Sequence, residues 1–536
     1  MNKFRTITMY FVLIVITIGL LFGVSRMERS LDDKVAEHRL RFTGQIKNAP
    51  PMVVFTTVAL GSFRGLVADL LWLRAGSLQE QGNYFEMVQL ARWITDLQPT
   101  FSGATAYLAW NMAYNISVTC SSFEDRWRWV NEGIKLIRDQ AIEYNPEDPV
   151  LYKELAWIFS HKLGNIMDDA NLYYKNRLAI LLTNIVGSSP DWEELAAAPA
   201  DRREFLKLYG PEHPLWTAAK AAGFEDYDAL YAAFKTPEPA ALPAAFTSRL
   251  NNEELAKKLT TYFRAAYLRE KLKLDPRRID ALNKKYGMMD WRVPESQAIY
   301  WATLGIERTP GNRDINCDRI ITQSLIEAFK SGRLLMIDET SFESIIVVPN
   351  LALIDAVDER ALYTQEVYEP GRKTSAFRSA RINFLKDAVA LLYNFGQFSK
   401  AEEYYRKLIK EDPGASRGPL ENFVMEAWVE DIRDATVKRA SEIVSGLLSQ
   451  SIYYMIYNDQ DAALANERMA RFVYRRYQTT MGDTPRTQLP PYSQMKQSVV
   501  EGYRRTLPEP LVKLLNQKIM REQMEAAAEN KPPSTN

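Results

Sequence analysis

Two stretches of the sequence, GNYFEMVQLARWITDLQP at residues 82–99 and GQFSKAEEYYRKLIKEDP at residues 396–413, have the same internal spacing. Each begins with a glycine (Gly82, Gly396), has an aromatic residue two positions later (Tyr84, Phe398), and ends with a proline (Pro99, Pro413). Between these points, Met87, Ala91 and Ile94 align with Ala401, Tyr405 and Leu408. Glycine permits a tight reversal of the chain and proline ends a helix, so the pair predicts two copies of one helical hairpin.

A second pattern marks the helix that begins such a hairpin. In the tetratricopeptide repeat (TPR) this helix carries W-x2-L-G-x2-Y. The same spacing is found after Asn145-Pro146, at Tyr152, Leu155, Ala156 and Phe159. A partial match follows Pro99, at Thr105, Leu108, Ala109 and Met112. The two patterns together resemble a degenerate TPR array. The array has insertions, because Pro99 and Pro146 lie further apart than the TPR period of ~34 residues.

An uncharged run, TITMYFVLIVITIGLLFGV, extends from Thr6 to Val24. At about 1.5 Å per residue it is just long enough to cross a hydrocarbon core of about 30 Å. A cleaved signal peptide is the competing interpretation, but its apolar region is shorter, and Gly23-Val24-Ser25 followed by Arg26 is a poor cleavage site. We therefore expect a single-pass membrane anchor. Lys3 and Arg5 favour an extracytoplasmic (periplasmic) bulk, although basic residues on the other flank leave the orientation open.

A second apolar stretch runs from Met52 to Leu73 and is interrupted by Arg64 and Asp69. A charge in mid-bilayer is expensive unless it is paired. We expect this stretch to form either an interfacial helix or the buried first helix of the folded domain. The predicted fold class is thus all-α: an N-terminal transmembrane helix followed by a TPR-like helical-hairpin array (α-solenoid) with irregular insertions.

Composition restricts the function classes of this 536-residue chain. Lys plus Arg equals Asp plus Glu at 67 each, which argues against a nucleic-acid partner, because polyanion binding needs a basic surface. The two cysteines, Cys120 and Cys317, are far apart, and the three histidines have no metal-ligand spacing. Phosphate-binding loops and nucleophile-elbow motifs are also absent from the sequence. We therefore expect no metal, no cofactor and no catalytic residue, and predict that the protein is not an enzyme.

The organisation along the chain follows from changes in composition and periodicity. Two segments rich in alanine and proline, LAAAPA at residues 195–200 and TPEPAALPAAF at residues 236–246, indicate an insertion or hinge without a fold of its own. The segment SIIVVP at residues 344–349 indicates an extended connector. The predicted regions are an anchor (1–30), a charged stalk (31–50), an N-terminal TPR-like array (51–190), the insertion (191–250), an irregular helical middle (251–375), a C-terminal TPR-like region (376–480), and a final helix with a disordered tail (481–536).

The densest aromatic and polar cluster lies between residues 110 and 129. Its members are Trp110, Asn111, Tyr114, Asn115, Arg126, Trp127 and Trp129. On facing helices these side chains would line a groove suited to a peptide, a glycan or an acidic group, because indole faces bury area while amides and guanidinium fix orientation. Ordinary core packing is the favoured alternative, since aromatic residues dominate cores.

Asp290, Trp291 and Arg292 form a second candidate, a structured loop before a helix that starts near Pro294. The favoured interpretation is structural: Asp290 pairs with Arg292 or caps the helix. A third group, Glu154, His161, Asp168 and Asp169, suggests metal or acid–base chemistry only weakly, and a solvated turn is favoured because no ligand motif is present.

Together these features predict a membrane-tethered TPR-like scaffold for protein–protein interaction. Its partner would be an unidentified protein or peptide. Membrane-anchored TPR proteins generally act in envelope assembly, secretion or polysaccharide export, and the resemblance extends that expectation to this chain. The alternative is a glycan- or lipid-binding envelope module that uses an aromatic groove.

Overall fold

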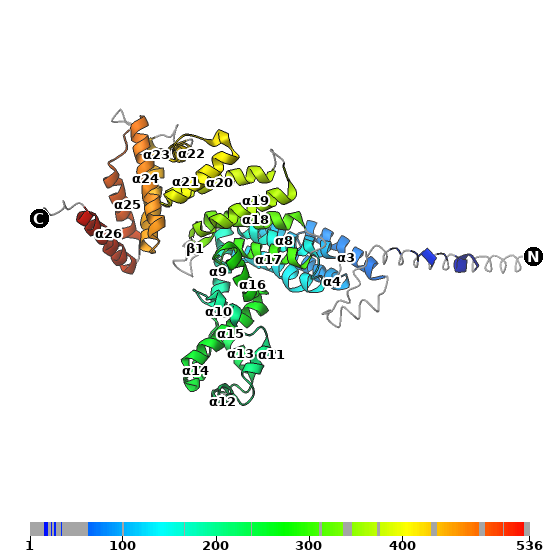
Figure 1. The fold of residues 1–536 in the computed structure, drawn as a ribbon. Helices are drawn as coiled ribbons and strands as arrows, with labels where there is room; N and C mark the ends of the chain where they lie inside the picture. Colours follow the sequence, from blue (N-terminus) through cyan, green and yellow to red (C-terminus); the bar gives the residue numbers. More distant parts are fainter. Residues whose placement is uncertain are drawn as a thin grey trace, which may run out of the picture.

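The computed structural model of the protein is all-α, as the periodicity predicts (Figure 1). It describes residues 63–98, 101–165, 167–236, 238–309, 314–335, 346–371, 376–429, 437–481, 488–507 and 509–529, and a few residues among the first 34. These residues include 24 α-helices. No helix within this described part is both long and apolar enough to cross a membrane. Most of the predicted anchor from Thr6 to Val24, much of the predicted stalk, and Pro99 lie outside the described residues.

The N-terminal part consists of successive antiparallel helices that pack on their neighbours. The first hairpin is α3 (Phe63–Glu80) with α4 (Tyr84–Leu97). The following helices are α5 (Ser102–Trp110) with η1 (Asn111–Ile116) and η2 (Ser117–Thr119), α6 (Phe123–Lys135) with η3 (Leu136–Ala141) and α7 (Ile142–Tyr144), α8 (Pro149–Trp157) with η4 (Ile158–Leu163), and α9 (Asn171–Val186). The segments η1, η3 and η4 are π-helical turns, which widen the helix locally.

The two glycines of the repeated motif stand at turns of one geometry. Gly82 and Gly396 both have φ of 75°, a left-handed conformation that strains any residue with a Cβ. In the first turn the Asn83 N–H donates to the Leu78 carbonyl at 2.9 Å and the Gly82 N–H to Gln79 at 3.1 Å. The second turn repeats both bonds, to the carbonyls of Leu392 and Tyr393 at 2.9 and 3.0 Å. This is the Schellman termination of a helix, and it reverses the chain into α4 and into α21 (Phe398–Glu411).

The three aligned positions between the glycine and the proline face the core, whereas the aromatic residue of the motif is half-buried at Tyr84 and 47% exposed at Phe398. In α4 the three positions are Met87, Ala91 and Ile94, and in α21 Ala401, Tyr405 and Leu408, each no more than 3% exposed. The first-helix positions are buried in the same way: Thr105, Leu108, Ala109 and Met112 in α5 and η1, and Tyr152, Leu155, Ala156 and Phe159 in α8 and η4. Close backbone approach adds to this packing, because a Cβ on Gly133 would lie 2.7 Å from the Ala109 carbonyl oxygen. Pro413 begins a short 3-10 turn, η7 (Pro413–Ala415), directly after α21.

Residues 191–250 form a helical arm that projects from the body (Figure 1). Aspartate side chains cap three of its helices at Asp191, Asp201 and Asp226. Its helices are α10 (Trp192–Ala197), α11 (Arg202–Leu208), α12 (Pro214–Ala221), α13 (Tyr227–Lys235) and α14 (Ala244–Leu250), with α15 (Glu253–Leu272) and α16 (Pro276–Tyr286) leading back. Phe205, fully buried, stacks on Tyr262 with ring centroids 4.2 Å apart. The insertion therefore has an aromatic core, where the sequence suggested only a hinge.

The chain then returns to the N-terminal helices. α17 (Pro294–Arg308) packs on α8 and on α18 (Ile315–Ser331). Close contact is possible because a Cβ on Gly305 would lie 2.6 Å from the Cβ of Tyr152. The segment expected to be a plain connector contains β2 (Ile346–Val348), which pairs antiparallel with β1 (Arg333–Leu335) in the register Leu334↔Val347. η6 (Leu351–Leu353) and α19 (Ile354–Tyr368) follow.

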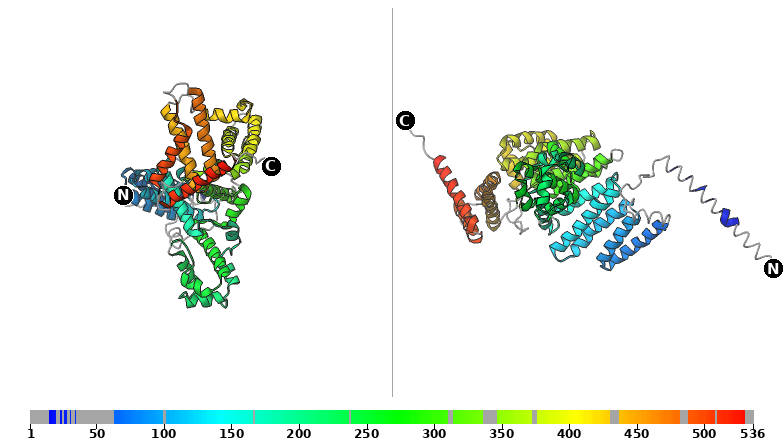
Figure 2. Two further views of the ribbon diagram at one scale, coloured as in Figure 1. Left: turned by 90° about the vertical axis from the view of Figure 1, so that its left-hand side faces the viewer. Right: turned by 90° about the horizontal axis from the view of Figure 1, so that it is seen from below.

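The C-terminal part contains the second hairpin and a separate bundle. α20 (Ala376–Asn394) packs on α21, and α22 (Leu420–Val429) follows. α23 (Val437–Ile456), α24 (Gln460–Met481), α25 (Tyr492–Thr506) and α26 (Glu509–Glu529) then pack around cores of their own. The predicted region 376–480 is thus divided between two cores. Figures 1 and 2 place the α3–α4 hairpin and the α23–α26 bundle at opposite ends of the molecule.

Candidate functional site

The aromatic cluster at residues 110–129 divides between two surface grooves. Trp110 lies in one between α5, α8 and α18, which we call the α5–α8 groove. Trp127 and Trp129 line the other, between α4 and α6, which we call the α4–α6 groove. The two sets are on successive antiparallel helices, so closeness in sequence does not place them in one site.

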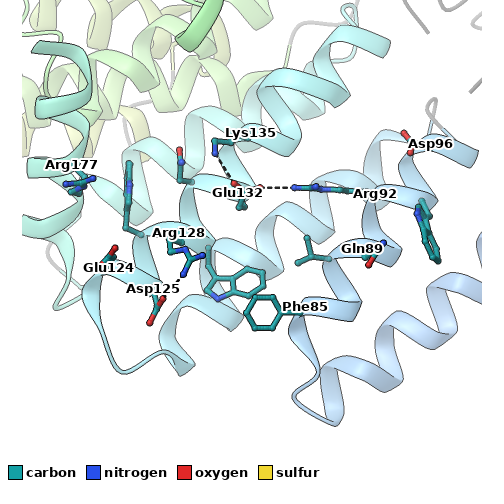
Figure 3. A pocket seen from close by; sticks show the side chains of 15 residues that line it. Phe85, Gln89, Arg92, Asp96, Glu124, Asp125, Arg128, Glu132, Lys135 and Arg177 are labelled. Atoms are coloured by element: carbon teal, nitrogen blue, oxygen red, sulfur yellow. Dashed lines mark hydrogen bonds and ion pairs between the residues drawn. The ribbon is translucent and has the colours of Figure 1, made fainter. Parts of the chain in front are cut away.

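The α4–α6 groove has a volume of about 890 Å³. Figure 3 shows Phe85 reaching into it from α4. The Phe85 ring lies 5.5 Å from that of Trp129 on α6, yet 83% of Phe85 is exposed. Trp93, two turns further along α4, is 49% exposed. These two side chains lie on the side of α4 opposite its buried face. The groove therefore exposes large apolar side chains to water.

Charges of both signs surround these aromatic residues. The Arg92 guanidinium donates to a Glu132 carboxylate oxygen at 2.9 Å, and Lys135 donates to the other at 2.9 Å, so a chain of ion pairs spans the groove (Figure 3). Burial raises the pKa of the Asp96 carboxyl, although Arg92 opposes this. The other charged lining residues are Glu124, Asp125, Arg128 and Arg177. Four acids thus face four bases, and the groove favours a ligand with mixed charge over a polyanion.

The α5–α8 groove has a volume of about 790 Å³ and is walled by aromatic residues. Tyr107, Trp110 and Trp157 line it, with Tyr107 46% and Trp110 36% exposed. The polar residues on its walls are Lys153, Glu154, Asn316, Arg319 and Gln323. Lys153 and Glu154 pair with each other.

Six rings form a continuous series along this face, which we call the aromatic ladder. From Trp72 on α3 it passes to Tyr107 (5.3 Å between ring centroids), Trp110 (6.4 Å), Tyr114 (5.4 Å), His161 (5.8 Å) and Trp157 (4.6 Å). The members come from α3, from α5 with η1, and from α8 with η4, the first helices of three successive hairpins. The ladder therefore runs across the hairpins and not along one helix.

The π-helical turns hold two ladder members. Tyr114 lies in η1 and His161 in η4, and the Tyr114 hydroxyl is 3.3 Å from Nδ1 of His161. Burial raises the pKa of Tyr114, so its hydroxyl stays protonated at neutral pH. Burial, helped by the neighbouring charge of Lys162, lowers the pKa of His161 below 6.5. Both rings are thus neutral near pH 7, which suits stacking in a partly apolar surface.

The polar members of the predicted cluster have other surroundings. Asn111 is fully buried, where its side-chain oxygen accepts bonds from Gln79 (3.2 Å) and Asn115 (2.6 Å). Arg126 pairs with Asp168 and Asp169 and donates to the Cys120 carbonyl at 3.0 Å. Asn111 is therefore a core residue, and the guanidinium of Arg126 is occupied by acids of the chain itself.

Asp290, Trp291 and Arg292 belong to a structural junction. Asp290 accepts bonds from the Arg292 side chain at 2.9 and 2.8 Å and from the Leu334 N–H of β1 at 2.9 Å. Trp291 is 1% exposed and donates to the Asn283 side chain at 3.0 Å. The residue before α17 is Val293 and offers no side-chain cap, so Asp290 pairs with Arg292 without capping the helix.

The third candidate group does not come together as one centre. Asp168 pairs with the buried Lys162 at 2.5 Å and with Arg126, while His161 stacks on Trp157. Burial by itself raises the pKa of Asp168, but hydrogen bonds from Lys162 and the Ala170 N–H outweigh it and the pKa is lowered. Across the described ranges there is no group of three or more His, Cys, Asp or Glu residues arranged to hold a metal ion.

The sequence reasoning missed one residue of the aromatic ladder, Trp72, and several residues of the two grooves: Phe85, Arg92, Trp93, Glu132, Tyr107, Trp157 and Arg319. A usable signal existed for Phe85 and Trp93. The core positions Met87, Ala91 and Ile94 define one side of α4. Phe85 and Trp93 fall on the other side of the helix, so they have no place in the core.

Comparison with known protein families and curated proteins found no match. No protein-family model matches the chain, and no curated protein is significantly similar to it. The fold and the site by themselves define an all-α protein of helical hairpins with two aromatic-walled grooves near its N-terminal end.

Proposed function

We propose that this chain is a membrane-tethered scaffold of TPR-like helical hairpins that binds a segment of a partner protein in the α4–α6 groove. The anchor would be the run from Thr6 to Val24. Envelope assembly, secretion and polysaccharide export are the processes in which such a tethered scaffold would act. No enzymatic step is part of the proposal.

The observation that carries the proposal is the exposure of large aromatic side chains in a groove. Phe85 and Trp93 are 83% and 49% exposed beside Trp127 and Trp129. Aromatic residues and arginine in a concave surface are the groups that dominate protein–protein binding energy. The recurring glycine turn and the matching buried positions support the repeat interpretation, because two hairpins far apart in the sequence share the same turn geometry and the same buried positions.

The test places a photo-crosslinking amino acid at Phe85 in the full-length protein in intact membranes. Leu208, a 63% exposed leucine on the arm, is the matched control position. We expect one protein adduct from position 85, none from position 208, and loss of the adduct with Trp93→Ala. Phe85→Ala should weaken binding of the purified adduct protein by about 2 kcal/mol or more, roughly 30-fold. Equal adducts from both positions, or adducts indifferent to Trp93→Ala, would refute the groove assignment.

Orientation and anchoring have their own measurements. The full chain should float with lipid vesicles, and it should stop doing so when the run from Thr6 to Val24 is removed. A reporter enzyme fused after Asn536 should be active only if the C-terminal bulk is extracytoplasmic.

A glycan-binding envelope module is a second candidate, favoured by the aromatic ladder. Tyr107, Trp110 and Trp157 line the α5–α8 groove next to Asn316 and Gln323, and aromatic faces with nearby amides suit sugar rings. Titration with cell-wall fragments should change the intrinsic tryptophan fluorescence, and Trp110→Ala should remove that change. A flat titration would exclude this candidate.

A further inference from the structure

The first helix of the folded body, α3, has apolar residues on the side that faces away from the protein. Leu66, Leu70 and Leu73 are 58%, 59% and 70% exposed. Their spacing of four and then three positions places them on one helix face. Ala75 and Leu78 are buried on the opposite side, where α3 packs on α4. We call the three leucines the leucine stripe. Within the described ranges, no other segment covers it.

An exposed leucine stripe is unusual at the end of a stack of hairpins. The terminal unit of such a stack normally has a polar outer face, because no further unit covers it. A helix that is apolar on both sides is normally buried on both. The leucine stripe, flanked by the exposed Asp69 and Arg74, therefore favours an apolar environment that is not part of the folded body.

A lipid bilayer fits this requirement better than a second copy of the chain. Stable protein interfaces bury about 1,200–2,000 Å², far more than three side chains on one helix supply. The proposed anchor ends at Val24, and only the segment 25–62 separates it from the start of α3. Such a tether makes contact with the same membrane an intramolecular event, so even a small apolar surface is sufficient.

The surroundings of the stripe agree with this environment. Trp72, on the flank of the same helix, contacts Tyr107 with ring centroids 5.3 Å apart. Tryptophan and tyrosine are the side chains that favour the boundary between lipid and water. Figure 1 places α3 at the end of the folded body nearest the N-terminus.

We propose that the leucine stripe of α3 lies in the interfacial region of the bilayer, with the helix parallel to the membrane plane. The inference rests on the proposed function for its anchor. An interfacial helix buries its apolar face about 5–10 Å into the boundary between headgroups and acyl chains. The contact would fix how the hairpins and their grooves face the membrane, which an anchor and a linker alone would leave free.

The test uses the full chain in lipid vesicles, with Cys120→Ser and Cys317→Ala as background. An environment-sensitive fluorophore is attached at Leu70→Cys or at Leu208→Cys, which are 59% and 63% exposed leucines in the two positions. We expect spin-labelled lipids to quench the probe at position 70 several-fold more than the probe at position 208. A spin label near the headgroup should quench more than one near the acyl end.

Two results would overturn the inference. Equal and weak quenching at both positions would show that lipid does not reach α3. A position-70 probe shielded from aqueous iodide but not quenched by lipid would show that protein, either a second copy or another segment of the chain, covers the stripe. Flotation of the same samples separates this inference from the proposed function. If the chain does not float, the anchor fails, and if it floats without quenching at position 70, only the leucine stripe fails.

Discussion

Replacing Asp290 with alanine should loosen the junction between α17 and the β1–β2 pair. Four bonds converge on this carboxylate: from the Arg292 N–H (3.0 Å), from Arg292 Nε and Nη2 (2.9 and 2.8 Å), and from the Leu334 N–H (2.9 Å). Arg292 Nη2 also donates to the Leu334 carbonyl at 2.8 Å. Removing the carboxylate leaves a guanidinium and a strand amide without their main acceptor.

The expected cost follows from the burial of the pair. The side chains of Asp290 and Arg292 are 13% and 26% exposed. Breaking a fully buried pair costs about 3–5 kcal/mol, and an exposed pair is worth about 0–1 kcal/mol. The intermediate burial places this variant at about 2–3 kcal/mol, which is a ~30- to ~160-fold increase in the local opening equilibrium. The double variant Asp290→Ala/Arg292→Ala should be milder, because no unpaired guanidinium remains.

Hydrogen exchange on the full-length protein measures this directly, because it reports opening segment by segment. Peptides that contain Leu334 and the start of α17 should exchange faster in Asp290→Ala. Glu86→Ala is the control, since the pair Arg74–Glu86 is 60% and 49% exposed and should cost less than about 1 kcal/mol. If Asp290→Ala accelerates exchange at its junction no more than Glu86→Ala does at α3 and α4, the structural role of Asp290 is refuted.

Further changes at three glycines and at His161 test the packing and the aromatic ladder. Gly76 is an exposed residue in the middle of α3 with no atom near the position of a new Cβ, so Gly76→Ala should raise the free energy of unfolding by about 0.5–1 kcal/mol. Gly82 has φ of 75°, so Gly82→Ala should lower the free energy of unfolding by about 1 kcal/mol in thermal unfolding. Gly133→Ala should cost about 1–3 kcal/mol, because its Cβ would meet the Ala109 carbonyl oxygen at 2.7 Å; unchanged stability would show that α5 and α6 separate readily. His161 should titrate below 6.5 by NMR, with its signal assigned through His161→Gln. The unfolded chain binds that proton more tightly, so this group's contribution to stability is complete above pH 6.5 and is lost as the pH falls through the folded pKa. A pKa of 6.5 or higher would contradict the half-buried placement of His161.

The parts of the fold that sequence reasoning predicted are those encoded within a few residues. A glycine followed by an aromatic residue predicted a reversal, because a left-handed residue is needed where the chain turns back. Apolar residues at three- and four-residue intervals predicted the helices, because burial selects one face. Both signals are local, and the turns at Gly82 and Gly396 show one geometry although they belong to opposite halves of the sequence.

The parts that sequence reasoning missed depend on long-range contacts. The arm has a core because Phe205 on α11 meets Tyr262 on α15, several helices later in the chain, and neither residue is informative alone. β1 forms because Leu334 pairs with Val347 and its N–H reaches Asp290, which fixes a strand of only three residues. Text rich in alanine and proline predicts short helices and breaks correctly, but it does not reveal whether their aromatic residues share a core.

The candidate site shows how a helical face decides between core and surface. In α5 and η1 the core positions Thr105, Leu108, Ala109 and Met112 occupy one side of the helix. Tyr107, Trp110 and Tyr114 have spacings of three and four positions and fall on the opposite side. There Tyr107 and Trp110 are exposed, whereas Tyr114 is half-buried against the core. Asn111 lies between the two faces and is buried by its bonds to Gln79 and Asn115. An aromatic series opposite a complete core face is therefore a better sequence signal for the wall of a surface groove than aromatic density, which grouped Trp110 with Trp127 although they line different grooves.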